Sequence, residues 1–226
     1  MVRSAVIVAG GKGLRMQTDI PKQFLELNGK PVLMHTIEQF YNAFDSNIQI
    51  VLVLPLDHQG YWKSLCNKLS FHIPHAVAHG GQTRFDSVKS GLSKCPDTGI
   101  VGIHDGVRPL ISQELIQNCY SVAEEKGSAL PVVAITQSLR KRELSTSHPI
   151  DREGMCAVQT PQCFDILSIR NAYESANHKD FTDDATVFEA ADGQISLVDG
   201  EETNIKITTQ ADLKIAEAIL GMSTVR

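Results

Sequence analysis

Short runs of apolar, mostly β-branched residues alternate with longer amphipathic segments along almost the whole chain, and this alternation restricts the fold strongly. The runs at 4–8, 48–54 and 100–104 are apolar at consecutive positions, as expected for strands buried on both faces of a parallel sheet. Helical patterns occupy 34–44, 58–69, 83–93, 113–125, 166–176, 183–191 and 210–220. Strands separated by helices, with right-handed crossovers, predict an α/β fold with a Rossmann-like, mostly parallel twisted sheet and helices on both faces.

Residues 136–159 depart from this alternation. The segment is polar, carries the basic run Arg140, Lys141 and Arg142 in its middle, and shows no helical period. A loop of this length within a compact domain usually has a function or reaches a neighbouring molecule. A chain of 226 residues exceeds one typical domain of roughly 150 residues by about half. We therefore expect a single domain over residues 1–226 with a protruding arm at about 136–159.

The chain has 21 Lys and Arg residues against 26 Asp and Glu residues, a formal net charge of −5. This balance excludes a protein that coats nucleic acid or an anionic membrane, while a local basic pocket for a small phosphorylated ligand remains open. No apolar stretch approaches the roughly 20 residues of a membrane span, and the first residues lack the features of a signal peptide. The five cysteines are scattered without a CxxC pair, as expected for reduced thiols. We expect a cytoplasmic enzyme.

The first predicted strand runs directly into a glycine-rich turn that contains Ala9, Gly10, Gly11 and Gly13. Glycines at this place let backbone N–H groups approach and bind phosphate. The spacing matches neither the Walker pattern nor GxGxxG, and a tight connection between strand and helix is the alternative. Two cations, Arg15 and Lys22, follow the turn. A pair of cations beside a backbone anion site suits a triphosphate that is attacked at its α-phosphorus.

Asp105 and Arg108 follow the third predicted strand, at the carboxyl edge where open α/β sheets bind their ligands. Asp105 can accept hydrogen bonds from substrate hydroxyls or help to hold a divalent ion, and a turn-capping role before Gly106 is its alternative. The planar guanidinium of Arg108 suits phosphate or polyol oxygens, and a solvated surface position is its alternative.

A second glycine pair, Gly80 and Gly81, precedes a predicted helix, and backbone groups there can read the edge of a pyrimidine. Ser87, one turn into that helix, either faces the ligand or bonds its own backbone, and both roles stay open. Lys206 lies between two isoleucines in a short predicted strand, so it points away from the core into which they pack. A solvated strand lysine is the alternative.

Three other groups of ionisable residues are expected to be structural. His104 resembles a general base beside an acid, but an attacking phosphate is already ionised at neutral pH, so we expect an orienting role. Asp183 and Asp184 resemble a metal-binding pair, but they stand at the start of a predicted helix, where an N-cap and a first-turn carboxylate are favourable. The histidines at 72, 75 and 79 have no carboxylate partners beside them, so a metal site is not expected there. No protein ligand to a metal is predicted.

These motifs, taken in order, resemble a known enzyme family. The stretch AGGxGxRM followed by PKQ resembles the sugar-nucleotide pyrophosphorylase superfamily. Further stretches narrow the resemblance to the 2-C-methyl-D-erythritol 4-phosphate cytidylyltransferase family of the non-mevalonate isoprenoid pathway. They are AHGGQTRFDSV (78–88), IHDGVRP (103–109), DREG (151–154), QTPQ (159–162), FTDD (181–184) and NIKIT (204–208). The matches run from about residue 5 to residue 216.

The resemblance implies a nucleotide-diphospho-sugar transferase type of fold and a transfer of CMP from CTP to a polyol phosphate, with release of pyrophosphate. It implies Mg²⁺ bound mainly through the CTP phosphates. The implied catalytic residues are Arg15, Lys22 and Lys206. The implied nucleotide-binding residues are Ala9, Gly10, Gly11, Gly13, Gly80, Gly81, Gln82 and Ser87. The implied acceptor-binding residues are Asp105, Arg108, Ser138, Arg152 and Thr160.

In this family the arm interlocks with that of a second copy, so the resemblance implies a homodimer in which Ser138, Arg140 and Arg152 serve the partner's site. Some relatives are fused to the next enzyme of the pathway, and we expect this chain of 226 residues to carry a single activity.

Three alternatives stay open at this point. Ribitol 5-phosphate cytidylyltransferases share AGGxGxRM, PKQ and QTPQ, and the pair Gly10-Gly11 matches them slightly better. The stretches at 138–140, 151–154 and 181–184 favour methylerythritol phosphate instead. A nucleotide-binding protein without catalysis is the second alternative. A Rossmann-type dehydrogenase is the third, and the glycine spacing disfavours it.

Overall fold

The structure is a computed structural model that describes residues 1–11 and 20–223. It confirms the predicted α/β fold with a mostly parallel central sheet. The helices are α1 (Val32–Ala43), α2 (Leu56–Lys68), α3 (Arg84–Leu92), α4 (Gln113–Lys126), α5 (Ile166–Ser175), α6 (Asp184–Glu189) and α7 (Gln210–Ser223). The strands of the central sheet are β1 (Arg3–Val8), β4 (Gln49–Leu54), β5 (Ala76–His79), β6 (Ile100–Asp105), β7 (Ser128–Ala134), β10 (Cys156–Val158), β11 (Gln162–Asp165) and β12 (Leu197–Asp199).

The central sheet runs in the order β10-β7-β11-β6-β1-β4-β5, and β12 pairs with β7. β6, β1, β4 and β5 are mutually parallel, whereas β11 lies antiparallel between β6 and β7. Val8 at the end of β1 pairs with Asp105 at the end of β6. The carboxyl ends of the parallel strands therefore meet at one edge of the sheet, where ligands bind in open α/β folds.

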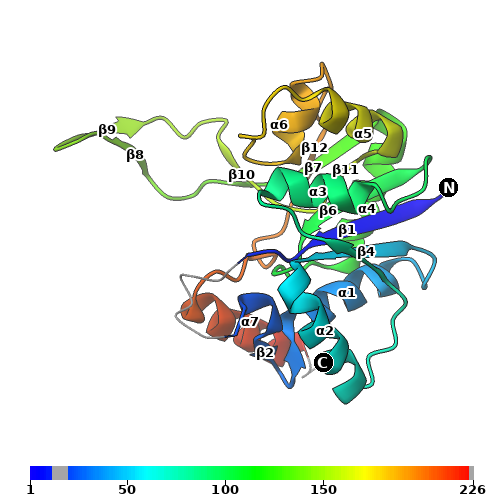
Figure 1. The fold of residues 1–226 in the computed structure, drawn as a ribbon. Coiled ribbons are helices and arrows are strands. Elements are labelled where there is room, and N and C mark those ends of the chain that lie inside the picture. Colours follow the sequence, from blue (N-terminus) through cyan, green and yellow to red (C-terminus); the bar gives the residue numbers. More distant parts are fainter. Residues whose placement is uncertain (12–19, 224–226) are drawn as a thin grey trace.

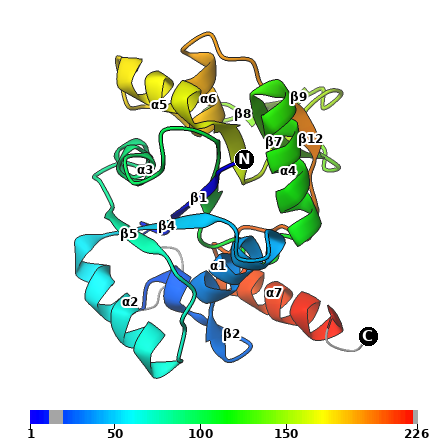
Figure 2. The ribbon, with the colours of Figure 1, turned by 90° about the vertical axis from the view of Figure 1, so that its right-hand side faces the viewer.

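Helices cover both faces of the sheet (Figure 2). Buried side chains of α1, α2 and α4 pack on one face, and those of α3, α5 and α6 pack on the other. Successive residues of β1 alternate between the two layers, since Ala5 and Ile7 belong to the first and Val6 to the second. Burial on both faces explains why these strands are apolar at consecutive positions.

Local signals in the sequence set where the helices begin and end. Thr83 caps α3 through a capping box with Asp86, and the hydroxyl of Ser112 accepts a hydrogen bond from the N–H of Leu115 in α4. α4 ends at Lys126, and Gly127 after it has a φ of 85°, the left-handed conformation that glycine adopts without strain. These ends fix the loops that reach the carboxyl edge of the sheet.

The arm leaves the body of the molecule as a long ribbon (Figure 1). Its strands β8 (Leu139–Arg142) and β9 (Ser147–Ile150) pair antiparallel, and β10 then returns to pair with β7. The sequence showed no strand here because most side chains of the ribbon are exposed, so no alternation of apolar and polar residues marks it.

The remaining predicted elements compare well with the structure. Each predicted helix and each of the three predicted strands is confirmed, with ends shifted by a few residues. The short strand predicted around Lys206 is wrong, because residues 204–208 form no strand. The N–H of Ile207 donates to the carbonyl of Val107, whereas those of Asn204 and Ile205 donate to nearby carbonyls of their own segment. Short pieces complete the described chain, namely η2 (Lys22–Phe24), β2 (Glu26–Leu27) and β3 (Lys30–Pro31). Among the described residues, no helix has both the length and the apolar character needed to cross a membrane.

Candidate active site

A cavity of about 260 Å³ opens at the carboxyl edge of β1 and β6. It is lined by Val8, Ala9, Gly10, Gly11, Lys22, Gln23, Gly81, Gln82, Thr83, Arg84, Ser87, Asp105, Val107 and Lys206. Most of the residues predicted to bind the nucleotide are thus brought together here. Gly80, which is also predicted, directly precedes the lining residue Gly81 in the chain. Gly13 and Arg15 lie outside the described residues.

Lys22 lies against the glycine-rich turn. A Cβ atom on Gly11 would lie 3.3 Å from Cε of Lys22, so the absence of a side chain at this position leaves room for the lysine. The next residue, Gln23, is buried and donates a hydrogen bond from Nε2 to the carbonyl of Ala9, at 2.8 Å. This hydrogen bond holds the segment of Lys22 beside the end of β1.

Gly81 makes a close backbone approach that only glycine allows. A Cβ atom there would lie 2.2 Å from Cβ of Asp86. The N–H of Gly81 donates to Oγ of Ser87 at 3.0 Å, and that hydroxyl donates to the carbonyl of Thr83 at 2.9 Å. Ser87 therefore bonds its own helix and also lines the cavity, so the two roles left open for it are compatible.

A second cavity of about 340 Å³ adjoins the first. It is lined by Arg84, Asp105, Arg108, Val158, Gln159, Thr160, Gln162, Thr182, Asp183 and Lys206. Arg84, Asp105 and Lys206 line both cavities. The arrangement suits two ligands that meet at these three side chains.

Asp105 is the anionic centre of this junction. Its Oδ2 lies 2.8 Å from Nζ of Lys206 and 3.5 Å from Nε of Arg108. Burial alone would favour the neutral acid, but Lys206, Arg84 and Arg108 hold the pKa of Asp105 well below its usual range. The carboxylate is therefore ionised at neutral pH and can accept hydrogen bonds from hydroxyl groups.

A buried chain of hydrogen bonds lies beneath Asp105. The hydroxyl of Thr160 accepts from the N–H of Asp105 at 3.1 Å and lies 3.0 Å from Nδ1 of His104. Nε2 of His104 lies 3.2 Å from the carbonyl of Arg108, which can only accept, so Nε2 carries the proton and Nδ1 accepts from Thr160. Burial lowers the pKa of His104 to about 4. His104 is thus a neutral, orienting residue, as its sequence context indicates.

The segment that follows β12 holds Arg108 and carries Lys206. Nη1 of Arg108 donates to the carbonyl of Asn204 at 2.6 Å, and Nδ2 of Asn204 donates to the carbonyl of Thr160 at 3.0 Å. Ile207 is buried and fixes the segment, while Lys206 beside it reaches Asp105. Lys206 therefore points toward the cleft without belonging to a strand.

Arg84 lines both cavities, although no pattern in the sequence singles it out. It lies within the stretch that resembles the cytidylyltransferases, but its partner Asp184 is 100 positions away. Two hydrogen bonds, at 2.8 and 2.6 Å, join the guanidinium of Arg84 to that carboxylate. Asp183 caps α6 as predicted, and Asp184 is the carboxylate of the first turn, where it is fully buried in this ion pair.

Two predicted acceptor-binding residues lie apart from the cleft of their own chain. Ser138 and Arg152 are exposed at the base of the arm, and neither lines the two cavities. The guanidinium of Arg152 donates to the carbonyl of Thr136 across that base. Within the arm, Arg140 donates to Ser147.

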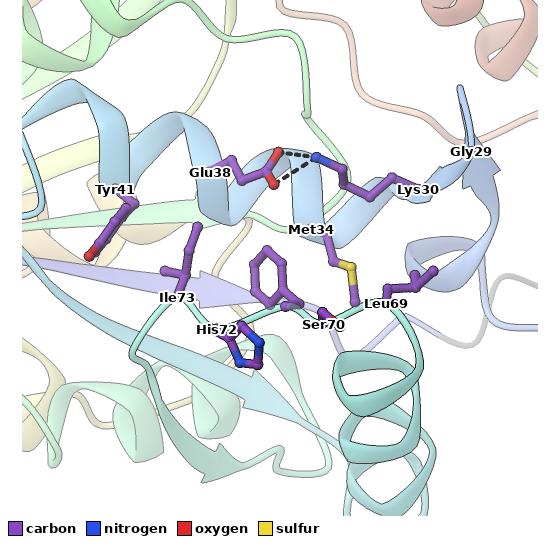
Figure 3. Close-up of a pocket in the computed structure, with 10 residues that line it drawn as sticks. Gly29, Lys30, Met34, Glu38, Tyr41, Leu69, Ser70, His72 and Ile73 are labelled. Atoms are coloured by element: carbon purple, nitrogen blue, oxygen red, sulfur yellow. Dashed lines mark hydrogen bonds and ion pairs between the residues drawn. The ribbon is translucent and has the colours of Figure 1, made fainter.

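Another hollow, of about 530 Å³, lies between α1 and the segment that joins α2 to β5 (Figure 3). Apolar side chains such as Met34, Leu69 and Ile73 face it, and Lys30 forms an ion pair with Glu38 at 2.7 Å. It contains none of the predicted site residues. Most of the predicted site residues in the described chain line the paired cavities at the sheet edge instead.

The comparison with protein families agrees with this geometry. Residues 3–222 match the family model described as "IspD: 2-C-methyl-D-erythritol 4-phosphate cytidylyltransferase". The chain belongs to this family. The resemblance seen in the sequence is thereby confirmed, and with it an enzyme that is a CTP-dependent nucleotidyltransferase.

Individual relatives cover the chain almost completely. A 2-C-methyl-D-erythritol 4-phosphate cytidylyltransferase of Phocaeicola vulgatus is 50% identical over 220 residues, which span 97% of this chain and 100% of that one. The enzyme of the same name from Bacteroides fragilis is 49% identical over 220 residues, which again span 97% of this chain and 100% of that one. The crystal structure of the enzyme of the same name from Thermus thermophilus has a TM-score of 0.81 at 29% identity, covering 97% of this chain and 98% of that one.

Proposed function

We propose that this enzyme transfers CMP from CTP to the phosphate of 2-C-methyl-D-erythritol 4-phosphate, forming 4-diphosphocytidyl-2-C-methyl-D-erythritol and pyrophosphate. The observation that carries the proposal is the junction of the two cavities at Arg84, Asp105 and Lys206. One cavity has the glycine turns and Lys22 for a nucleotide, and the other has Arg108 and Thr160 for the acceptor. The names of the curated relatives favour methylerythritol phosphate over ribitol 5-phosphate.

The chain's own contribution to catalysis is positioning and charge stabilisation. The acceptor phosphate attacks the α-phosphorus of CTP in line, the new P–O bond forms, and the bond to the β-phosphate oxygen breaks as pyrophosphate leaves. Lys22, Arg15 and Lys206 stabilise the negative charge, and Asp105 receives hydroxyl groups of the acceptor. No general base is needed, which fits the neutral His104, whose two ring nitrogens are both engaged within the protein.

We propose Mg²⁺ as the cofactor. Among the described residues, no three His, Cys, Asp or Glu side chains gather as a metal site. Asp105 is the carboxylate that lines both cavities, and one carboxylate together with substrate phosphates is a usual environment for this ion. Such a site fits Mg²⁺ held mainly by CTP. Bound there, the ion would neutralise phosphate charge.

The test measures pyrophosphate release with CTP, Mg²⁺ and either methylerythritol phosphate or ribitol 5-phosphate. We expect turnover with the first acceptor, and a loss of at least about 100-fold in kcat for Lys22→Ala, because a cation at the transferred phosphate is removed. Lys63→Ala, an exposed lysine of α2, is the matched control and should retain activity. Preference for ribitol 5-phosphate would overturn the acceptor, and a nearly unchanged rate in Lys22→Ala would overturn the mechanism.

We also propose that two copies of the chain form a homodimer in which the arm of each supplies Ser138, Arg140 and Arg152 to the other's site. The exposure of these residues, away from their own chain's cavities, supports this arrangement. Mixing inactive Lys22→Ala with inactive Arg152→Ala tests it. In mixed dimers one site combines both intact residues, so about a quarter of the activity should return. No recovery of activity after verified exchange of subunits would refute the shared site.

A cytoplasmic location is proposed as well, supported by the five free cysteines.

A further inference from the structure

The ion pair of Arg84 and Asp184 joins the two halves of the cleft. Arg84 is the first residue of α3 and Asp184 the first of α6, so the pair ties together the starts of these helices. The loop before α3 lines the nucleotide cavity through residues 81–83, and the loop before α6 lines the acceptor cavity through residues 182–183. The ion pair thus connects the segments that face the two substrates.

The geometry of the pair is rigid. Asp184 has no exposed surface, and besides the two bonds to Arg84 its Oδ1 accepts from the hydroxyl of Tyr173 at 2.6 Å. Burial and the carboxylate raise the pKa of Tyr173 far above its usual range, so the hydroxyl stays protonated and donates. Parallel bonds from one guanidinium to one carboxylate fix the plane of Arg84 as well as its position.

Both ends of the pair are anchored to the body of the protein. On the α6 side, Gln162 of β11 donates to Asp183 at 2.9 Å and accepts from the N–H of Ala185 at 2.8 Å. On the α3 side, Phe85 packs against the ring of Tyr173, with centroids 4.6 Å apart. The pair therefore fixes the position of Arg84 relative to the sheet, and this position is not set by the loops alone.

The fixed guanidinium lies where two anionic substrates would meet. The side chain of Arg84 is 30% exposed and lines both cavities, beside Asp105 and Lys206. Two of its five N–H donors are used by Asp184, which leaves others for the cleft. A triphosphate and an acceptor phosphate repel each other, and a cation held between them offsets this repulsion.

We propose that Asp184 is a positioning residue that acts through Arg84, and that this pair makes the binding of the nucleotide and the binding of the acceptor phosphate mutually favourable. The inference rests on the proposed function. Without the carboxylate, Arg84 turns to solvent or to one ligand alone, and the second anion then binds against uncompensated charge. The predicted property is a coupling between two binding events, distinct from the affinity of either site alone.

Two other ion pairs connect α3 to the same region and supply a control. Asp86 meets Lys179 at 2.6 Å, and Lys89 of α3 meets Glu174 of α5 at 2.8 Å. The Lys89 pair is exposed, and neither of its residues lines the two cavities. Lys89→Ala therefore removes a link between the helices without touching the junction.

The experiment measures the affinity of the full-length enzyme for methylerythritol phosphate by calorimetry, with and without a saturating, non-reactive α,β-methylene analogue of CTP. The ratio of the two dissociation constants gives the coupling for the wild type, Asp184→Asn, Arg84→Lys and Lys89→Ala. A uniform loss of affinity or of stability cancels in this ratio. Arg84→Lys keeps the positive charge but cannot form two parallel bonds, so it carries the test if Asp184→Asn does not fold.

We expect the analogue to strengthen acceptor binding at least about fivefold in the wild type and in Lys89→Ala. In Asp184→Asn and Arg84→Lys the ratio should fall to one or below. A wild-type ratio near one, an unchanged ratio in the variants of the pair, or an equal loss in Lys89→Ala would each overturn the inference. Turnover by the wild type separates this failure from that of the proposed function, because an enzyme that turns over both substrates but lacks the coupling refutes the inference alone.

Discussion

Replacing Thr160 with valine removes one hydroxyl from beneath the acceptor cavity while keeping the shape of the side chain. Thr160 is only 5% exposed, and its hydroxyl serves two buried groups, the N–H of Asp105 and Nδ1 of His104. Valine can neither accept from the first nor donate to the second. Both groups then stay buried without a partner.

The expected magnitude follows from these two groups. A buried polar group that loses its partner destabilises the folded protein by about 1–3 kcal/mol, so Thr160→Val should lower the free energy of unfolding by about 2–6 kcal/mol. Thr160→Ser keeps the hydroxyl and removes one methyl group, which should lower that free energy by only about 1 kcal/mol. The comparison separates loss of the hydrogen bonds from loss of packing.

Urea unfolding followed by circular dichroism at pH 7.5 measures the free energies, and pyrophosphate release measures turnover with methylerythritol phosphate. Because the backbone of Asp105 loses its support, kcat/KM for the acceptor should fall at least about tenfold in Thr160→Val. A valine variant within about 0.5 kcal/mol of the wild type, or a serine variant as unstable as the valine variant, would refute the hydrogen-bond chain.

Two further predictions concern charge. Lys206→Met should lower kcat by about 100-fold or more. It should also shift the acid limb of the pH–rate profile to higher pH, because the pKa of Asp105 rises when its closest cation is removed. An unchanged acid limb would contradict this electrostatic role of Lys206. Burial lowers the pKa of His104 from 6.5 to about 4. Between these pH values the unfolded chain therefore binds more protons than the folded chain. The free energy of unfolding should fall by about 3 kcal/mol as the pH decreases from 6.5 to 4. Burial also lowers the pKa of His35, which adds to the same trend, so the measurement is the difference in pH dependence between the wild type and His104→Asn.

The fold could be predicted where a local pattern carried the information. Strands β1, β4 and β6 are buried on both faces, and their consecutive apolar residues indicate this directly. Strand β5, at the edge of the sheet, has mostly exposed residues, and β11 is a short strand. Neither has a pattern that differs from that of a loop, since their pairing is set by neighbours distant in the sequence.

The candidate site divides in the same way. Gly11, Lys22 and Gly81 stand in short stretches whose composition indicates phosphate and base binding, and the structure brings them to one cavity. Arg84 stands in the same stretch as Gly81, yet nothing local distinguishes it from a surface arginine. Its role depends on a carboxylate 100 positions away, which only the packing of the helices brings within hydrogen-bond distance.

Asp183 and Asp184 illustrate why neighbouring residues of one type acquire different roles. Asp183 precedes α6, and its side chain caps the helix by accepting from the N–H of Thr186, a role that local sequence predicts. Asp184 is the first helical residue, and one step along a helix turns a side chain by about 100° around the axis. That turn directs Asp184 inward to Arg84, where a charge is stable only because a cation is already buried there. The helix start thus determines the direction of the carboxylate, and the surrounding fold determines whether that carboxylate caps a helix or holds a substrate-facing arginine in place.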